Sequence, residues 1–172
     1  WVYKTSVENA LRKEAPRPNR LTPEQSKAQL AALRQPYRFE YRNKPAFTIQ
    51  IPGEFAQRKA TNGNVFHASK AFNTLSISVS QSGDLHQAAK RYVEALKRVG
   101  NGKAEMVTES VTKLPDGTPA VEFLVKWVTK QNAVQTTQAL TACDDGHCVT
   151  VATHTWEVGL PDKRFFFTLK FE

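Results

Sequence analysis

The sequence predicts an α+β fold, in which a mainly antiparallel, twisted β-sheet carries helices packed on it. From residue 37 onward, apolar and polar residues alternate with a period of two in one segment after another, which is the pattern of half-buried strands. Turn sequences rich in Gly, Pro, Asn and Asp separate these segments. One stretch, residues 84–99, has instead the period of a strongly amphipathic helix. These three observations define the class.

The first 36 residues differ from the rest, and we expect an N-terminal extension with short helices, followed by a single α+β domain at residues 37–172. Pro16 and Pro18 break the first of these helices, because proline lacks an amide donor and disfavours the helical conformation in the residue before it. Pro23 suits the first position of a second helix. This second helix either docks on the domain or forms a partly ordered spacer from an anchor.

Four strands are expected in the next part of the chain, each from its alternation of apolar and polar residues. They cover residues 37–41, 47–51, 65–68 and 75–79. The fourth has serine at every second position beside leucine, isoleucine and valine, so one of its faces is apolar and the other polar.

Residues 84–99 are expected to form the main helix. Asp84 is a suitable N-cap, and Gly100 is expected to end the helix in the left-handed conformation. The apolar residues recur at intervals of three and four: Leu85, Ala88, Ala89, Tyr92, Val93, Leu96 and Val99. One face of this helix therefore packs on the sheet, and the charged face meets solvent.

The second half of the chain is expected to be a run of antiparallel strands. A strand at residues 106–114 leads through the turn Pro115-Asp116-Gly117 into a meander over residues 118–156, and residues 165–171 are expected to form the last strand. In total we expect six to eight strands in one sheet, with the main helix on one face and a second face that is polar or only partly covered.

Cys143 and Cys148, the two cysteines of the chain, bracket the turn of the last hairpin of this meander. Across an antiparallel hairpin they would face each other at a separation that a disulfide can bridge, and a disulfide favours an oxidising compartment. Two alternatives stay open: reduced cysteines in a cytosolic protein, or a metal site that includes His147. The spacing lacks the paired short intervals of structural zinc sites, so we predict no metal ligands and no cofactor.

Several of these features recur together in one known group. They are Phe47-Thr48-Ile49-Gln50-Ile51-Pro52 followed by Phe55, the strand at 75–79, the Asp84 helix, the turn Leu114-Pro115-Asp116-Gly117 and the strands at 121–127 and 149–156. Over residues 37–171 this order resembles the PsbP/Mog1/DcrB-like group. The resemblance implies an α/β/α sandwich around an antiparallel sheet, non-enzymatic accessory roles, and exported or lipid-anchored bacterial members. The strand expected at 165–171, where the group has a final helix, and the cysteine hairpin depart from the group, and no functional residue is carried over.

The sequence contains none of the motifs that identify common catalytic sites, such as a glycine-rich phosphate loop, a Gly-x-Ser-x-Gly elbow or His-Glu-x-x-His. We therefore expect a non-catalytic binding or accessory domain of the bacterial cell envelope, which acts through its polar sheet face or a cleft beside the Asp84 helix. The alternative is a hydrolase or isomerase with a cleft site between sheet and helix. Tyr92, Glu122 and His154 are the candidate residues of such a binding surface.

The net charge of +8 raises a third alternative, a polyanion-binding protein. Residues 1–36 contain seven Lys or Arg and three Glu, so half of the excess lies in the extension. Because the other basic residues form scattered doublets, an unknown protein or an anionic envelope component is the expected partner, rather than nucleic acid. No window approaches the roughly 18 unbroken apolar residues of a membrane helix. We expect a periplasmic, envelope or secreted protein whose signal peptide has been removed, with a lipid anchor as one option.

Overall fold

The chain divides into two units, Trp1–Ala31 and Ala32–Glu172. The computed structural model describes residues 22–24, 36–41, 44–61, 63–156 and 163–172. In the first unit, Pro23 and Glu24 are helical, and the other residues of the two predicted N-terminal helices lie outside the described residues.

The described part of the second unit contains ten strands, one α-helix and one 3₁₀-helix. In chain order the elements are β1 (Tyr37–Tyr41), β2 (Lys44–Ile49), β3 (Ala56–Arg58), β4 (Asn64–Lys70), β5 (Asn73–Gln81), α3 (Leu85–Val99), β6 (Ala104–Lys113), β7 (Pro119–Val128), β8 (Val134–Asp144), β9 (His147–Thr155), the 3₁₀-helix η1 (Arg164–Thr168) and β10 (Lys170–Phe171). The predicted strands up to the cysteine hairpin are present. The structure adds β3, whose three residues are all exposed and show no apolar alternation.

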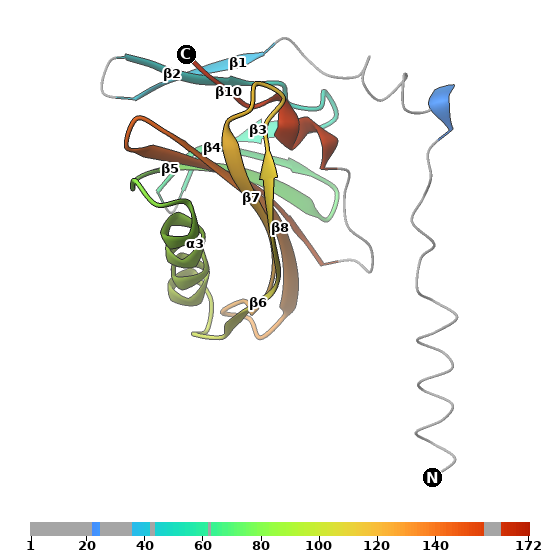
Figure 1. Ribbon diagram of the computed structural model, residues 1–172. Helices are drawn as coiled ribbons and strands as arrows, with labels where there is room; N and C mark the ends of the chain where they lie inside the picture. The colour runs from blue at the N-terminus through green and yellow to red at the C-terminus, as the bar shows by residue number, and fades with distance from the viewer. Residues whose placement is uncertain (1–21, 25–35, 42–43, 62, 157–162) are drawn as a thin grey trace. The chain divides into compact units, whose positions relative to one another are not determined.

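These elements form three layers (Figure 1). The central layer is a seven-stranded sheet with the order β3-β4-β5-β9-β8-β7-β6, in which every neighbouring pair is antiparallel. On one face, α3 contacts β6, β7, β8 and β9. On the other face lies a second sheet, with the order β1-β2-β10, together with η1. The predicted α+β class, with a mainly antiparallel sheet and a helix packed on it, is confirmed.

The second face of the large sheet differs from the expectation, because it is neither polar nor only partly covered. Phe47 of β2 and Phe166 of η1 are fully buried against Leu75 and Ile77 of β5. The strands present their apolar stripes to opposite faces, since the apolar residues of β7, such as Phe123, pack against α3 instead. Alternation identifies a buried stripe but does not tell which face of the sheet that stripe occupies.

The end of the chain also differs from the expectation. Residues 165–171 do not form one strand, because the 3₁₀-helix η1 precedes the two-residue strand β10. Phe165 and Phe166 are both buried, which consecutive residues of a strand with one exposed face cannot be. The backbone N–H of Gln50 donates to Thr168 Oγ1 at 2.9 Å. This hydrogen bond connects η1 to the end of β2.

Helix α3 begins as predicted, because the N–H of Gln87 donates to the carboxylate of Asp84 at 2.6 Å. Its end differs. Gly100 has φ −90° and is therefore not in the left-handed conformation. A Cβ at Gly100 would lie 2.3 Å from the backbone oxygen of Val128, and the N–H of Asn101 donates to that same oxygen at 3.0 Å. Glycine is needed here because the end of the helix approaches the backbone at the end of β7.

Candidate functional site

A cavity of about 250 Å³ lies between α3 and the large sheet. Four residues of α3 form its helical wall: Tyr92, Ala95, Leu96 and Val99. The sheet and the loop before β4 supply the other lining residues: Thr61, Asn64, His67, Thr74, Ser76, Trp127, Gln135 and His154. The lining thus combines an apolar helix face with hydroxyl, amide and imidazole groups.

The strand pattern explains why polar side chains face the helix at this point. On β5 the apolar residues Leu75 and Ile77 belong to the core between the sheets, so Ser76 faces the side of α3. On β9 the same alternation places His154 on the helix side, directly across from Thr74. The apolar stripe of α3 brings Tyr92 to the same cavity.

A chain of hydrogen bonds connects the buried polar groups of the site. The indole N–H of Trp127 donates to Thr137 Oγ1 at 2.8 Å, and the same oxygen lies 2.6 Å from Nδ1 of His154. The other ring nitrogen of His154, Nε2, lies 3.0 Å from Ser76 Oγ. An arrangement that satisfies all these groups has Thr137 donating to Nδ1 and Nε2 donating to Ser76. Both nitrogens of a neutral His154 are therefore occupied.

Burial sets the protonation states of Tyr92 and His154, two of the three ionisable residues that line the cavity. Desolvation lowers the pKa of His154 to about 4, and the nearby His67 contributes in the same direction. Desolvation also raises the pKa of the Tyr92 hydroxyl to about 12, although a hydrogen bond with Ser76 opposes part of this rise. At neutral pH both side chains are therefore uncharged, and the described lining of the cavity contains no Asp, Glu, Lys or Arg.

Ser76 and His154 are residue types that can serve as a catalytic nucleophile and its general base. A catalytic histidine needs a pKa near the working pH and a group that stabilises its imidazolium form. Here the pKa of His154 is about 4, and Nδ1 faces a threonine hydroxyl instead of a carboxylate. At neutral pH this histidine is a weak proton acceptor, so the geometry is better suited to fixing hydroxyl groups in place than to activating them.

A groove of about 530 Å³ lies along α3 beside β5. Tyr92 and Ala95 line both spaces, so the groove and the cavity are neighbours on the same side of the helix. On the sheet side the groove is lined by Ser78 and Ser80, and on the helix side by charged residues that include Arg98. The polar face predicted for residues 75–79 is therefore the floor of this groove.

The structure brings together two of the three residues predicted for a binding surface. Tyr92 and His154 line the same cavity. Glu122 does not, because it alternates with Val121 and Phe123, which face α3, and so lies on the opposite side of β7. Its carboxylate forms an ion pair with Lys163. The sequence did not identify Ser76 and Thr137 as site residues. The alternating serines of β5 predicted a polar face, but nothing in the sequence indicated that this face lies beside α3.

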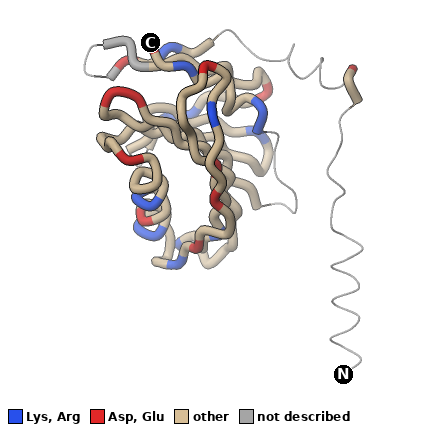
Figure 2. Tube along the Cα trace, viewed as in Figure 1, with Lys and Arg blue, Asp and Glu red and all other residues tan. Residues whose placement is uncertain are grey.

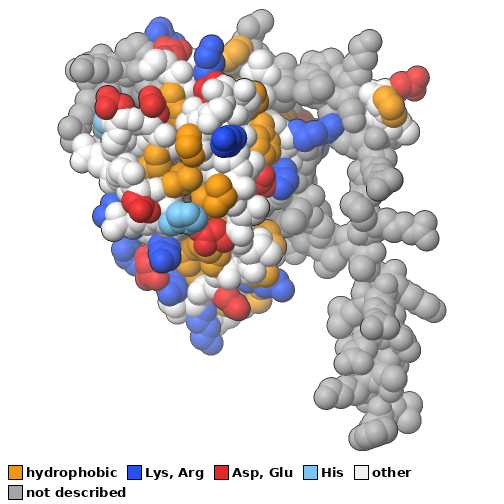
Figure 3. Space-filling view, in the orientation of Figure 1, with side chains coloured by type: hydrophobic (Ala, Val, Ile, Leu, Met, Phe, Trp, Pro, Cys, Tyr) orange, Lys and Arg blue, Asp and Glu red, His pale blue; other side chains and the backbone are white. Residues whose placement is uncertain are grey.

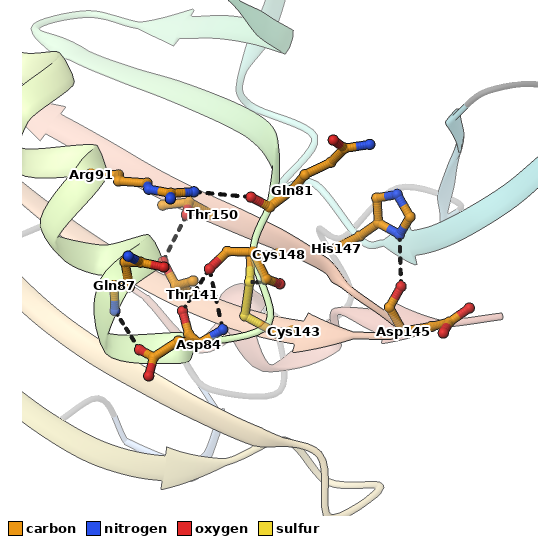
Figure 4. The surroundings of a disulfide bond; sticks show 11 residues. Gln81, Asp84, Gln87, Arg91, Thr141, Cys143, Asp145, His147, Cys148 and Thr150 are labelled. Atoms are coloured by element: carbon orange, nitrogen blue, oxygen red, sulfur yellow. Dashed lines mark hydrogen bonds between the residues drawn. A yellow bond between two sulfur atoms is a disulfide. The ribbon is translucent and has the colours of Figure 1, made fainter.

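The hairpin of β8 and β9 is closed by a disulfide between Cys143 and Cys148, which are paired across the strands with their Cα atoms 4.0 Å apart (Figure 4). Asp145 and Gly146 both have positive φ, as a two-residue hairpin turn of type I′ requires. Cys148 Sγ lies 3.3 Å from the backbone oxygen of Ser82, close to the start of α3. The predicted disulfide is confirmed, and it suits an extracellular or periplasmic protein.

Within the described ranges, no three His, Cys, Asp or Glu side chains lie close enough together to hold a metal ion. None of the helices described here has the length and apolar character needed to cross a bilayer.

The charged side chains of the described residues are distributed over the domain. Figure 2 shows Lys and Arg along α3 and on several strands, with Asp and Glu between them. On the face shown in Figure 3, the basic side chains are likewise interspersed with acidic ones. Mixed charges of this kind are weak support for polyanion binding, which relies on a concentrated basic surface.

Comparison with known proteins identifies the fold. No family model matches the sequence, and no curated protein matches it either. Among solved structures, the solution structure of cyanobacterial PsbP (CyanoP) from Synechocystis matches with a TM-score of 0.52 and 14% sequence identity, covering 70% of this chain and 79% of that chain. A Pseudomonas aeruginosa protein of unknown function matches with a TM-score of 0.41 and 12% identity, covering 71% of this chain and 83% of that chain. The chain therefore has the PsbP-like fold that the order of its elements predicts.

Proposed function

We propose that this protein is a non-catalytic binding domain, which holds a small uncharged ligand in the cavity between α3 and the large sheet. The observation that carries the proposal is the combination of an open cavity with buried polar groups that are neutral and already hydrogen-bonded to one another. Such a site can orient a ligand through a few fixed polar groups and bury its apolar part against the helix.

The absence of Asp, Glu, Lys and Arg from the described lining favours an uncharged ligand. A charged group that enters a buried space loses its hydration and needs an opposite charge there. Tyr92 and His154 supply none at neutral pH, because burial shifts the pKa of each away from neutrality toward its uncharged form. An uncharged ligand with hydroxyl or amide groups has no such cost.

Titration with small uncharged compounds, followed by two-dimensional NMR of the backbone amides, tests this function. A library of neutral fragments that carry hydroxyl or amide groups should shift the signals of Ser76, Tyr92 and His154. Carboxylate and ammonium analogues of the same fragments should cause much smaller shifts. Equal shifts with the charged analogues, or shifts confined to other parts of the domain, would contradict the proposal.

We also propose that the domain works in the bacterial cell envelope, as an accessory protein to a partner there. The disulfide supports an oxidising location, and exported members occur in the group that the sequence resembles. Alkylation of the protein in intact cells, followed by mass spectrometry, checks this location. Two alkylated cysteines in protein taken directly from its cells would contradict it.

A further inference from the structure

The cavity is one part of a longer binding surface along β5. Ser80 and Ser78 line the groove, and Ser76 and Thr74 line the cavity. The seven residues from Thr74 to Ser80 span about 20 Å of strand. Tyr92 lines both spaces, so the groove begins beside the cavity on the same side of the helix.

Two exposed aromatic side chains lie at the cavity end of this surface. Phe72 is 63% exposed in the turn before β5, and Trp156 is 49% exposed just after β9. Asn73 and Thr155, their neighbours in the chain, are paired across the two strands, so both aromatic residues lie at the same end of the sheet. Thr74 and His154, two residues further in, line the cavity. Among the described residues the other large apolar side chains that are exposed are all valines.

We propose that this surface binds a neutral oligosaccharide, with one sugar unit in the cavity and the next against Phe72 and Trp156. The inference rests on the proposed function and names its ligand class. Sugar hydroxyls pair with hydroxyl and amide side chains such as Asn64, Ser76 and Gln135. The C–H face of a pyranose packs on the face of an aromatic ring, which is large, rigid and apolar. These contacts require no charged group on the sugar or on the protein.

A peptide is a less suitable occupant of the same surface. Extended peptides are commonly bound by adding a strand to a free sheet edge, where main-chain groups remain unpaired. The floor of the cavity is formed by residues of β4, β5, β9, β8 and β7, and each of these strands has a hydrogen-bonded strand on both sides. The floor therefore offers side chains and no strand edge.

Calorimetric titration with three neutral tetrasaccharides, cellotetraose, maltotetraose and the tetramer of N-acetylglucosamine, tests the inference. At least one should bind and should shift the NMR signals of Ser76, Tyr92 and Trp156. Replacing both aromatic residues, Phe72→Ala with Trp156→Ala, should weaken binding about tenfold, since each stacked ring contributes a modest amount. The double variant should unfold at the temperature of the wild type, because both side chains are exposed.

Val111→Ala is the matched control, because Val111 is 68% exposed on the edge strand β6, away from β5 and β9, and its loss should leave the affinity unchanged. The inference is overturned if none of the three sugars binds, if the double variant binds as well as the wild type, or if an uncharged Ser/Thr/Asn peptide binds the cavity in place of the sugars. If the neutral fragments still shift the cavity signals in that case, the proposed function stands without the saccharide. If the fragments fail as well, both proposals fail.

Discussion

His154 is the residue on which the chemistry of the cavity depends. It is 9% exposed, and its ring makes contacts through both nitrogens, to Ser76 and to Thr137. The ring of Trp127 meets it edge to face, with the centroids 6.0 Å apart. These contacts fit a neutral imidazole, because its two nitrogens serve as one donor and one acceptor.

The stability of the protein should depend on the ionisation of His154. The pKa of this group falls from 6.5 to about 4 on folding, so the unfolded chain binds more protons between these two values. The resulting stability is present in full above pH 6.5 and is lost as the pH falls toward 4. For one buried histidine this loss amounts to about 3 kcal/mol in the free energy of unfolding.

Urea denaturation of the wild type and of His154→Gln at pH 7, 5 and 4 measures this contribution. Between pH 7 and pH 4 the wild type should lose about 3 kcal/mol more than the variant. Ser110→Gln, an exposed change that removes no ionisable group, serves as the control and should keep the pH dependence of the wild type. Parallel pH profiles for the wild type and His154→Gln would show that His154 is not held in its neutral form.

At the scale of single elements, the last turn of α3 forms part of the wall of the cavity. Gly100 lies against the backbone of Val128, and a Cβ there would also come within 3.1 Å of the Trp127 ring. Leu96 and Val99, in the last turn of the helix, line the cavity. A change at Gly100 therefore moves one wall of the site.

Gly100→Ala should destabilise the domain by about 2 kcal/mol, because the added methyl group meets backbone atoms that cannot rotate away. Thermal unfolding followed by circular dichroism measures the loss, and a change in the near-ultraviolet signal of the tryptophans should accompany it. Gly83→Ala is the control, since a Cβ at Gly83 meets nothing within 4 Å. Equal melting temperatures for Gly100→Ala and the wild type would mean that the helix end is not packed this closely.

The β8–β9 hairpin depends on its disulfide in a measurable way. Closing so short a loop removes conformational freedom from the unfolded chain, and the loop-entropy estimate for this contribution is about 2 kcal/mol. Addition of dithiothreitol should therefore lower the urea midpoint of the wild type. The double variant Cys143→Ala with Cys148→Ala should show the lower midpoint with or without the reductant. A wild-type midpoint that does not respond to dithiothreitol would contradict this account.

For the whole molecule, the sequence predicted the elements more reliably than their arrangement. The alternation of residues 75–79 and 121–127 located β5 and β7, because burial of one side chain in two leaves a clear period. The same alternation could not show that Leu75 and Phe123 face opposite layers. That choice depends on the small sheet, whose strands β2 and β10 are far apart in the chain.

The candidate site was predictable only in part, for a similar reason. Tyr92 and His154 are 62 residues apart in the chain, and only the pairing of β5 with β9 under α3 brings them together. Glu122 lies outside the site because its neighbours Val121 and Phe123 face the helix, and the alternation in the sequence could not show which layer they face. Ser76 and Thr137 belong to no motif, so their contacts with His154 follow from the fold alone.

The central claim is that the cavity between α3 and the sheet binds an uncharged ligand, and closing that cavity tests it most directly. Ala95 lines both the cavity and the groove, so Ala95→Met fills the space with a flexible apolar side chain that suits a helix. Lys90→Met places the same residue on the exposed face of α3 as the control.

The measurement is the affinity of both variants for the neutral fragment that shifts the cavity signals most strongly in the wild type. We predict that Ala95→Met loses at least tenfold in affinity while Lys90→Met and the wild type bind equally. Wild-type affinity in Ala95→Met, at an unchanged melting temperature, would contradict the claim.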